Sequence, residues 1–206
     1  MDLSLLIELP LLFFSIICHE YSHGAVAEKF GDDTARVMGR LTFNPLPHID
    51  PMGTIFLPLM CFLTNAPLFG WAKPVPVNPS RLDRQPLSLF LVSAIGPMTN
   101  LFLAAAAALG LAVTVRWLPA PWQDPLLIRV FNYTIIINLY LTVFNLMPIP
   151  PLDGSKVLEV VLPPLWRQQY ERLAPHGFLI ILLLMMTGIF GRIVTPIVYL
   201  LYRLLV

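Results

Sequence analysis

The sequence predicts an all-α protein that crosses a membrane several times. Of its 206 residues, 57% are hydrophobic and only 12% are charged, whereas soluble domains carry about 25% charged residues. This composition leaves too little polar surface to cover a globule in water. Apolar runs separated by proline-rich breaks predict about four to six transmembrane helices in a single domain over residues 1–206, with a small membrane-associated β element or a re-entrant loop between the first two crossings.

The charge balance argues against nucleic acid as a partner. The formal net charge is +1, and no basic stripe is present that could neutralise phosphates. Cys18 and Cys61 both lie within apolar runs, so we interpret them as buried small hydrophobic residues rather than as a disulfide. The lipid bilayer is therefore the partner that the composition predicts, and the oligomeric state stays open.

The first crossing is predicted over residues 3–30. The apolar part of this run is long enough to span a hydrocarbon core of ~30 Å. Lys29, Arg36 and Arg40 follow close to its end. By the positive-inside rule, this end of the helix faces the cytoplasm.

The segment between the first two crossings is irregular. Residues 35–44 show weak period-two alternation and predict a strand. Residues 52–66 are apolar but would reach only ~22 Å as a helix, with basic residues on both sides, which favours a re-entrant loop or hairpin. Residues 70–79 are rich in proline and predict an extended strand or loop.

Long apolar runs continue in the second half of the chain. Residues 87–115 and 126–147 predict the second and third crossings, joined by a short outer loop at residues 117–125. Residues 177–206 are longer than one crossing requires. We predict one tilted helix there, with two half-segments broken near Gly188, Gly191, Arg192 and Pro196 as the alternative.

Polar and small residues interrupt the second predicted crossing. Gly96 and Asn100 are one helical turn apart, so they would permit close helix approach and a hydrogen bond across helices. The alternative is a packing role alone, with Pro97 kinking the helix.

The first predicted helix contains the motif with the clearest chemistry, His19-Glu20-Tyr21-Ser22-His23. In a helix His19 and His23 lie on one face, and this spacing lets two imidazole nitrogens bind one Zn²⁺. Glu20 lies beside them, where it can act as a general base on a water molecule in metal-assisted hydrolysis. The alternative, two surface histidines on a soluble helix, disagrees with the apolar flanks, because ionisable groups at membrane depth are functional candidates.

A catalytic zinc needs a third protein ligand besides its water. Asp153 lies near the end of a break in the helical pattern at residues 148–154. Three prolines there lack N–H groups and leave backbone carbonyls unpaired, so these carbonyls must face protein or a water-filled cavity. Taken alone, Asp153 is an N-cap for a helix over residues 155–162. The need for a third ligand at the cytoplasmic end of the first helix favours Asp153 as that ligand, with Glu159 as the alternative.

Three motifs in order along the chain resemble those of the site-2 protease family of intramembrane zinc metalloproteases, peptidase family M50. They are His19-Glu20-x-x-His23, Gly96-Pro97-x-x-Asn100 and Asn145-Leu146-Met147-Pro148-Ile149-Pro150-Pro151-Leu152-Asp153-Gly154. The resemblance covers nearly the whole chain. It implies that His19, His23 and Asp153 hold one catalytic Zn²⁺ and that Glu20 activates the hydrolytic water.

The resemblance also implies roles for three further residues. Asn145 would bind the substrate backbone or stabilise the oxyanion, and Asn100 and Gly96 would lie at supporting or substrate-binding positions. The segments at residues 39–45 and 70–79 look like those of compact bacterial and archaeal members, and no stretch is long or polar enough for a PDZ or CBS domain.

The activity that the resemblance implies is hydrolysis of peptide bonds within or near transmembrane segments of membrane-protein substrates, in regulated intramembrane proteolysis. The location it implies is a prokaryotic plasma (inner) membrane, with the active site toward the cytoplasm. Two alternatives remain, a membrane metal-binding or metal-transport protein and an inactive relative that binds transmembrane clients. Glu20 beside His19 argues against both. The substrate, and any need for a prior cleavage, are not encoded in one sequence.

Overall fold

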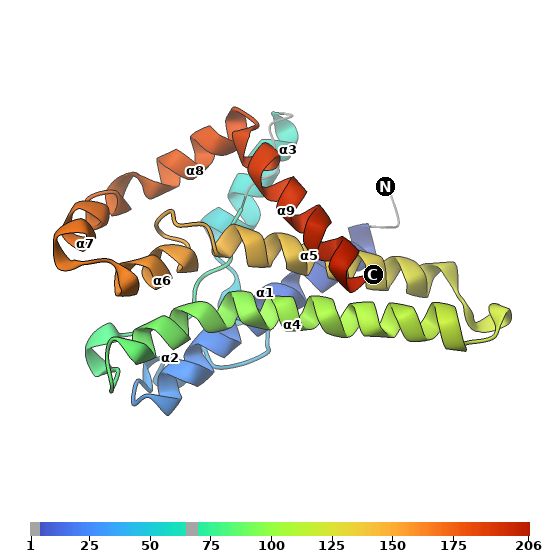
Figure 1. The fold of residues 1–206 in the computed structure, drawn as a ribbon, viewed down its shortest axis with the longest axis horizontal. Helices are drawn as coiled ribbons and strands as arrows, with labels where there is room; N and C mark the ends of the chain where they lie inside the picture. The colour runs from blue at the N-terminus through green and yellow to red at the C-terminus, as the bar shows by residue number, and fades with distance from the viewer. Residues whose placement is uncertain (1–4, 65–69) are drawn as a thin grey trace.

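The computed structural model describes residues 5–64 and 70–206, and the regular elements in these ranges are all helical (Figure 1). A π-helical turn at Pro51–Phe56 leads into α3, and short 3-10 turns lie in several connections. The predicted all-α class is confirmed. The α-helices are α1 (Leu5–Lys29), α2 (Thr34–Val37), α3 (Leu57–Leu63), α4 (Leu87–Trp117), α5 (Pro125–Asn145), α6 (Asp153–Val161), α7 (Pro164–Glu171), α8 (Gly177–Met186) and α9 (Ile189–Leu205).

Helices α4 and α5 form a central antiparallel pair, and α1 and α9 pack against it (Figure 1). Small residues on α4 let α5 approach closely, as is common between membrane helices. The first predicted helix matches α1 over the described residues, and residues 3 and 4 lie outside them. The buried core of this bundle consists of Ala104, Ala107, Ala108 and Leu111 of α4, Ile135, Leu139 and Val143 of α5, and Val194 and Val198 of α9.

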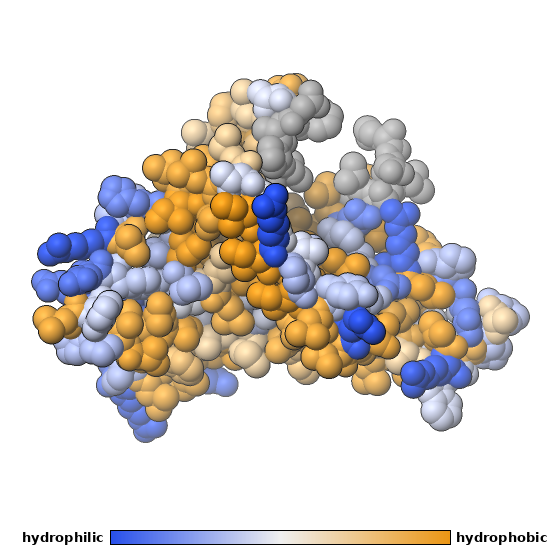
Figure 2. Space-filling view, turned by 45° about the horizontal axis from the view of Figure 1, so that its top comes forward, coloured by the Kyte–Doolittle hydropathy of each residue, from blue (hydrophilic) through white to orange (hydrophobic). Residues whose placement is uncertain are grey.

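The described helices include two, α4 and α5, that are long and apolar enough to cross a membrane. A third span results if Pro164–Met186 and α9 are counted together. The predicted number of four to six crossings is not confirmed, and α1, which carries the polar motif in its second half, is not among these spans. Apolar side chains cover much of the face in Figure 2, and hydrophilic ones gather mostly toward its two ends. This surface agrees with a membrane protein.

The predicted strand at residues 35–44 is wrong. The chain forms α2 there, followed by a turn in which Gly39 has φ +64°. The neighbouring side chains of Val37 and Met38 are 75% and 61% exposed, so the weak alternation does not describe one buried face. No strand occurs in residues 5–64 or 70–206, and the predicted β element is therefore not found there.

The other two predictions for this region concern residues 52–66 and 70–79. Residues 70–78 are extended without a β ladder, as the loop alternative predicted. The described part of the 52–66 segment is a short helical stretch, and residues 65 and 66 lie outside the described residues. Whether this stretch enters the membrane stays a prediction.

The prediction of one tilted helix over residues 177–206 is also wrong, and the two-segment alternative is correct. Gly188 has φ +72°, a left-handed conformation that commonly ends helices. The N–H groups of Thr187 and Gly188 bond back to carbonyls of α8, and α9 leaves at an angle of 80°. It then packs on α5, where the Tyr202 hydroxyl donates to Asn132 Oδ1 at 2.6 Å.

Candidate metal centre and active site

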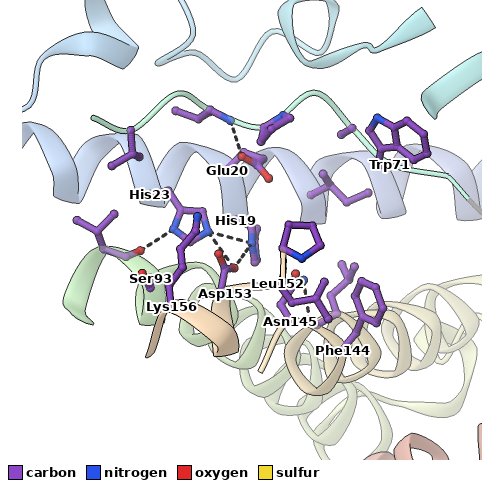
Figure 3. Close-up of a pocket in the computed structure, with 18 of the residues that line it drawn as sticks. His19, Glu20, His23, Trp71, Ser93, Phe144, Asn145, Leu152, Asp153 and Lys156 are labelled. Carbon is purple, nitrogen blue, oxygen red and sulfur yellow. Dashed lines mark hydrogen bonds and ion pairs between the residues drawn. The ribbon is translucent and has the colours of Figure 1, made fainter. Parts of the chain in front are cut away.

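Side chains from α1 and α6 meet at a buried cluster of His19, His23 and Asp153 (Figure 3). Asp153 Oδ2 lies 3.1 Å from His19 Nε2 and 3.2 Å from His23 Nε2. The two Nε2 atoms are 3.1 Å apart. Two ligands of a tetrahedral zinc, each about 2.05 Å from it, would lie about 3.3 Å apart. The three atoms therefore form a triangle that is close to the size a zinc ion requires.

The Nδ1 atoms of both histidines have partners that fix their tautomers. His23 Nδ1 lies 2.6 Å from the carbonyl oxygen of Val92, and His19 Nδ1 lies 2.6 Å from Asn100 Oδ1. Both partners are acceptors, so each Nδ1 carries a hydrogen and each Nε2 presents a lone pair. Two lone pairs and a carboxylate oxygen at this separation repel one another unless a cation lies between them. The donor set thus fits Zn²⁺.

Asp153 reaches the histidines because the proline-rich turn starts α6 beside α1. At Gly154 a Cβ would lie 2.2 Å from the carbonyl oxygen of Leu146, so only glycine lets the start of α6 pack this closely on the end of α5. Asp153 is the first residue of α6, and its Oδ2 faces the histidines. Glu159, the alternative ligand, is not part of the cluster.

Helix α4 supports the cluster from one side. A Cβ at Gly96 would lie 2.3 Å from His23 Nε2 and 2.6 Å from His19 Nε2. The close helix approach predicted for Gly96 is therefore observed at the candidate ligands themselves. Asn100, one turn further along α4, is fully buried and contacts His19.

The two candidate catalytic residues lie in the wall of the adjoining cavity. Glu20 Oε2 accepts a hydrogen bond of 2.7 Å from the backbone N–H of Val75, in the extended segment that passes over α1 (Figure 3). Asn145 lines the same cavity, but its Nδ2 donates to the carbonyl oxygen of Leu141 in its own helix. Their catalytic roles stay predictions.

Charged side chains, rather than a β ladder, hold residues 70–78 in place. The fully buried Asp32 accepts a hydrogen bond of 2.6 Å from the N–H of Asn78. Arg40, also buried, donates to the carbonyl oxygen of Lys73 at 2.7 Å. Sequence analysis gave Asp32 no role and used Arg40 only for orientation. No residue spacing links either of them to a segment more than thirty positions away.

The cluster opens onto a cavity of about 670 Å³. This volume falls within the range of roughly 300–1,000 Å³ that is usual for ligand pockets. Most of the lining is apolar, and it comes from α1, α4, α5, α6, α8 and the segment at residues 70–79. Lys156, one turn after Asp153 on α6, is an exposed cation at its edge (Figure 3).

A buried His-His-Asp centre with an adjacent glutamate, placed among apolar helices, is typical of membrane-embedded metal-dependent hydrolases. Comparison with known proteins agrees with this class. Residues 119–187 match peptidase family M50. Over 188 residues the chain is 38% identical to "Putative zinc metalloprotease YwhC" of Bacillus subtilis, an alignment that covers 90% of this chain and 82% of that protein.

A second relative is "Putative zinc metalloprotease Rip2" of Mycolicibacterium smegmatis, 31% identical over 188 residues, which are 90% of this chain and 68% of the relative. The chain belongs to peptidase family M50, the site-2 protease family. The resemblance found in the motifs is confirmed, and the predicted zinc cofactor agrees with the names of these relatives. No solved structure is significantly similar to the chain.

Two residues that the sequence analysis gave no role lie behind His19. Asn138 of α5 and Ser15 of α1 are both buried, and both bond to Asn100 or to each other. In the sequence Asn138 lies in an apolar run with Asn132 and Asn145, and unlike Asn145 it belongs to none of the three motifs.

Proposed function

We propose that this chain is an intramembrane zinc endopeptidase that cleaves membrane-protein substrates within or near their transmembrane segments. The observation that supports this most directly is the convergence of His19 Nε2, His23 Nε2 and Asp153 Oδ2, with Glu20 beside them in the cavity wall. Membership of peptidase family M50 supports the same chemistry.

The residues around the cavity have separate roles in the proposed hydrolysis. His19, His23 and Asp153 would hold Zn²⁺, which when bound polarises a carbonyl group and lowers the pKa of a water molecule. Glu20 takes a proton from the attacking water and later delivers it to the leaving amine. In the structure Glu20 Oε2 accepts a hydrogen bond from the N–H of Val75, and the second oxygen of the carboxylate can accept the proton.

Asn145 is the proposed donor to the oxyanion. A donor aimed at the developing charge contributes roughly 3–4 kcal/mol to transition-state stabilisation. The Asn145 amide lies in the cavity wall, but it points to Leu141 O. It would turn toward the substrate when the cavity is filled.

A transmembrane helix has its backbone amides paired internally, so a substrate has to unwind before cleavage. The extended segment at residues 70–78 lines the cavity beside Glu20. An unwound peptide could form main-chain hydrogen bonds, as in strand addition, with the backbone groups of this segment that Asp32, Arg40 and Glu20 do not already bind.

The variant Glu20→Gln tests the proposal. It should keep bound zinc, because the three ligands are untouched, and should lose cleavage, because an amide cannot accept the proton. Proteomics of membranes from cells that produce the wild type or the variant should show membrane-protein fragments that persist only with the variant. Elemental analysis of the purified proteins checks the zinc content.

Glu28→Gln is the matched control. Glu28 lies on the same helix two turns further on and pairs with Arg36 at the surface, so this variant should cleave normally. Normal processing by Glu20→Gln would remove Glu20 from its role. The transporter alternative has no support in residues 5–64 and 70–206, where one group of potential ligands is found and a transport path would require several.

A further inference from the structure

A chain of buried amide groups connects α5 to the candidate ligand His19. Asn100 Nδ2 donates to Asn138 Oδ1 at 2.9 Å, and Asn138 Nδ2 donates to Ser15 Oγ at 2.9 Å and to the carbonyl oxygen of Thr134 at 2.8 Å. Both asparagines are fully buried. Burial of an amide is costly unless its donors and acceptor are paired, so this complete pairing fixes how each amide is oriented.

The acceptor at the far end sets the direction of each hydrogen bond. A backbone carbonyl only accepts, so the NH₂ group of Asn138 has to face Thr134 O, and its Oδ1 has to face Asn100. Asn100 then presents its own NH₂ group to Asn138 and its Oδ1 to His19 Nδ1. An amide oxygen also only accepts. The hydrogen of His19 is therefore held on Nδ1, and the lone pair is held on Nε2.

Ser15 gives the network a second fixed end on α1. Its hydroxyl donates to the carbonyl oxygen of Leu11 at 2.9 Å, so Oγ can only accept from Asn138. Its backbone oxygen accepts a longer hydrogen bond of 3.3 Å from Asn100. Ser15 lies one turn before His19, and the network thus ties that histidine to three helices.

We propose that Asn138 is a positioning residue for the metal centre, which acts through Asn100 to hold His19 in the tautomer that binds Zn²⁺. Asn138 touches neither the ligand atoms nor the cavity. Without it, only the longer hydrogen bond of 3.3 Å to Ser15 O opposes a half-turn of the Asn100 amide, which would present the NH₂ group to His19 Nδ1. The hydrogen of His19 then moves to Nε2 and points into the site. This inference rests on the proposed function, because it takes His19 to be a zinc ligand.

The test is the zinc affinity of the purified protein in detergent, measured by competition with a chelator, which requires no substrate. Asn138→Leu keeps a similar volume and removes the hydrogen bonds. It should weaken zinc binding about tenfold, within the 10–100-fold range usual for residues behind a metal ligand. Asn100→Leu should weaken binding at least as much. Because Asn138 acts through Asn100, the double variant should bind zinc no more weakly than Asn100→Leu alone.

Two further variants separate positioning from a loss of packing. Asn132→Leu removes an amide from the same helix, bonded to Ile128 O and to the Tyr202 hydroxyl, and should leave zinc affinity unchanged. Asn138→Asp keeps an oxygen that accepts the hydrogen bond from Asn100. When its carboxyl group is protonated, it also keeps a donor for Thr134 O. It should retain most of the affinity, and it provides a readout if Asn138→Leu does not fold.

Unchanged zinc affinity in Asn138→Leu would overturn the inference and leave the proposed function standing. The same holds if adding Asn138→Leu to Asn100→Leu weakens zinc binding by as much as Asn138→Leu does alone. A loss in Asn132→Leu as large as in Asn138→Leu would also overturn it. If Asn138→Leu does not fold, the inference is overturned when Asn138→Asp binds zinc as weakly as Asn100→Leu. A wild-type protein that binds no zinc would overturn both proposals.

Discussion

Gly96 of α4 lies against the two histidines of the cluster, where a side chain would occupy the space of their Nε2 atoms. Gly96→Ala should therefore abolish stoichiometric zinc binding, because a Cβ at 2.3 Å from His23 Nε2 and 2.6 Å from His19 Nε2 forces both rings away. Elemental analysis of the purified variant gives the zinc content, and circular dichroism shows whether the helices persist.

Gly110→Ala is the matched control for Gly96→Ala. Gly110 lies on the same helix, and a Cβ there would meet the ring of Phe131 at 2.5 Å, on α5 and away from the cluster. This variant should lower thermal stability and keep its zinc. One zinc per chain in Gly96→Ala would contradict the geometry of the cluster.

Asp153 is the proposed charged ligand of the cluster. Asp153→Ala should lower zinc occupancy at a fixed free-zinc concentration, since two neutral imidazoles remain without the carboxylate that completes the donor set. Glu159→Ala, on the same helix, should keep full occupancy. Equal zinc content in wild type and Asp153→Ala would remove Asp153 from the donor set.

Sequence analysis could find the residues whose positions follow from helix geometry or from a motif. His19, Glu20 and His23 lie within five positions, and their relation in space is that of a single helical turn. Asp153 could be matched to them by the need for a third ligand. Asn138 could not be found, because no motif distinguishes it from Asn132 in the same apolar run. Only the structure shows that Asn138 faces Asn100 of α4 and that Asn132 faces Tyr202 of α9.

At the scale of elements, the long apolar helices were predictable and the segment between α1 and α4 was not. Length and hydropathy alone predict α4 and α5. Residues 35–44 and 70–78 form no ladder, because Asp32, Arg40 and Glu20 already bind backbone groups of the second segment and its prolines lack N–H groups. A charged side chain that binds a backbone in place of a neighbouring strand produces no periodic pattern in the sequence.

Asp32 anchors the extended segment to the end of α1, and its loss should destabilise the protein. Asp32→Asn turns one acceptor of a buried carboxylate into a donor that faces the N–H of Asn78 or the Thr34 groups. The expected loss is about 1–3 kcal/mol of unfolding free energy at pH 7. Thermal unfolding in detergent would show it.

The effect of Asp32 should depend on pH in a defined direction. Burial would raise the pKa of Asp32, but hydrogen bonds from Thr34 and Asn78 outweigh it and hold this pKa below the usual value. A depressed folded-state pKa stabilises above the unfolded-state pKa of about 3.9, and that stabilisation is lost as pH falls through the folded-state pKa. The difference between wild type and Asp32→Asn should therefore shrink below about pH 4.

Asp33→Asn is the control for both measurements on Asp32. Asp33 pairs with Arg81 at the surface, where both side chains are more than half exposed, and such pairs contribute little. Its substitution should leave stability nearly unchanged. A difference between wild type and Asp32→Asn that stays constant from pH 7 to pH 3 would show that Asp32 acts through packing alone.

At the scale of the whole molecule, charge is distributed unevenly along the central helix pair. The end of α1, α2, the start of α4, α6 and α7 lie at one end of the molecule, and the α4–α5 connection lies at the other (Figure 1). Residues 118–124 of that connection contain no lysine or arginine. The basic residues of the elements at the first end and of the segments that join them are Lys29, Arg36, Arg40, Lys73, Arg81, Arg84, Lys156, Arg167 and Arg172.

This asymmetry predicts the orientation of the protein in a plasma membrane. By the positive-inside rule, the end of the molecule with the basic residues and the candidate active site faces the cytoplasm. A cysteine introduced as Ala120→Cys in the α4–α5 connection should react with a membrane-impermeant maleimide in spheroplasts. One introduced as Ser80→Cys before α4 should react only after the membrane is opened.

Both labelling positions are exposed in the structure, so accessibility to the reagent depends on the side of the membrane. The unsubstituted protein gives the background from Cys18 and Cys61, of which Cys61 is buried and Cys18 partly so. Labelling of Ser80→Cys, and not Ala120→Cys, in sealed spheroplasts would reverse the orientation. The cavity beside Glu20 would then open toward the outer side, and a membrane-protein substrate would have to present its scissile segment from that side.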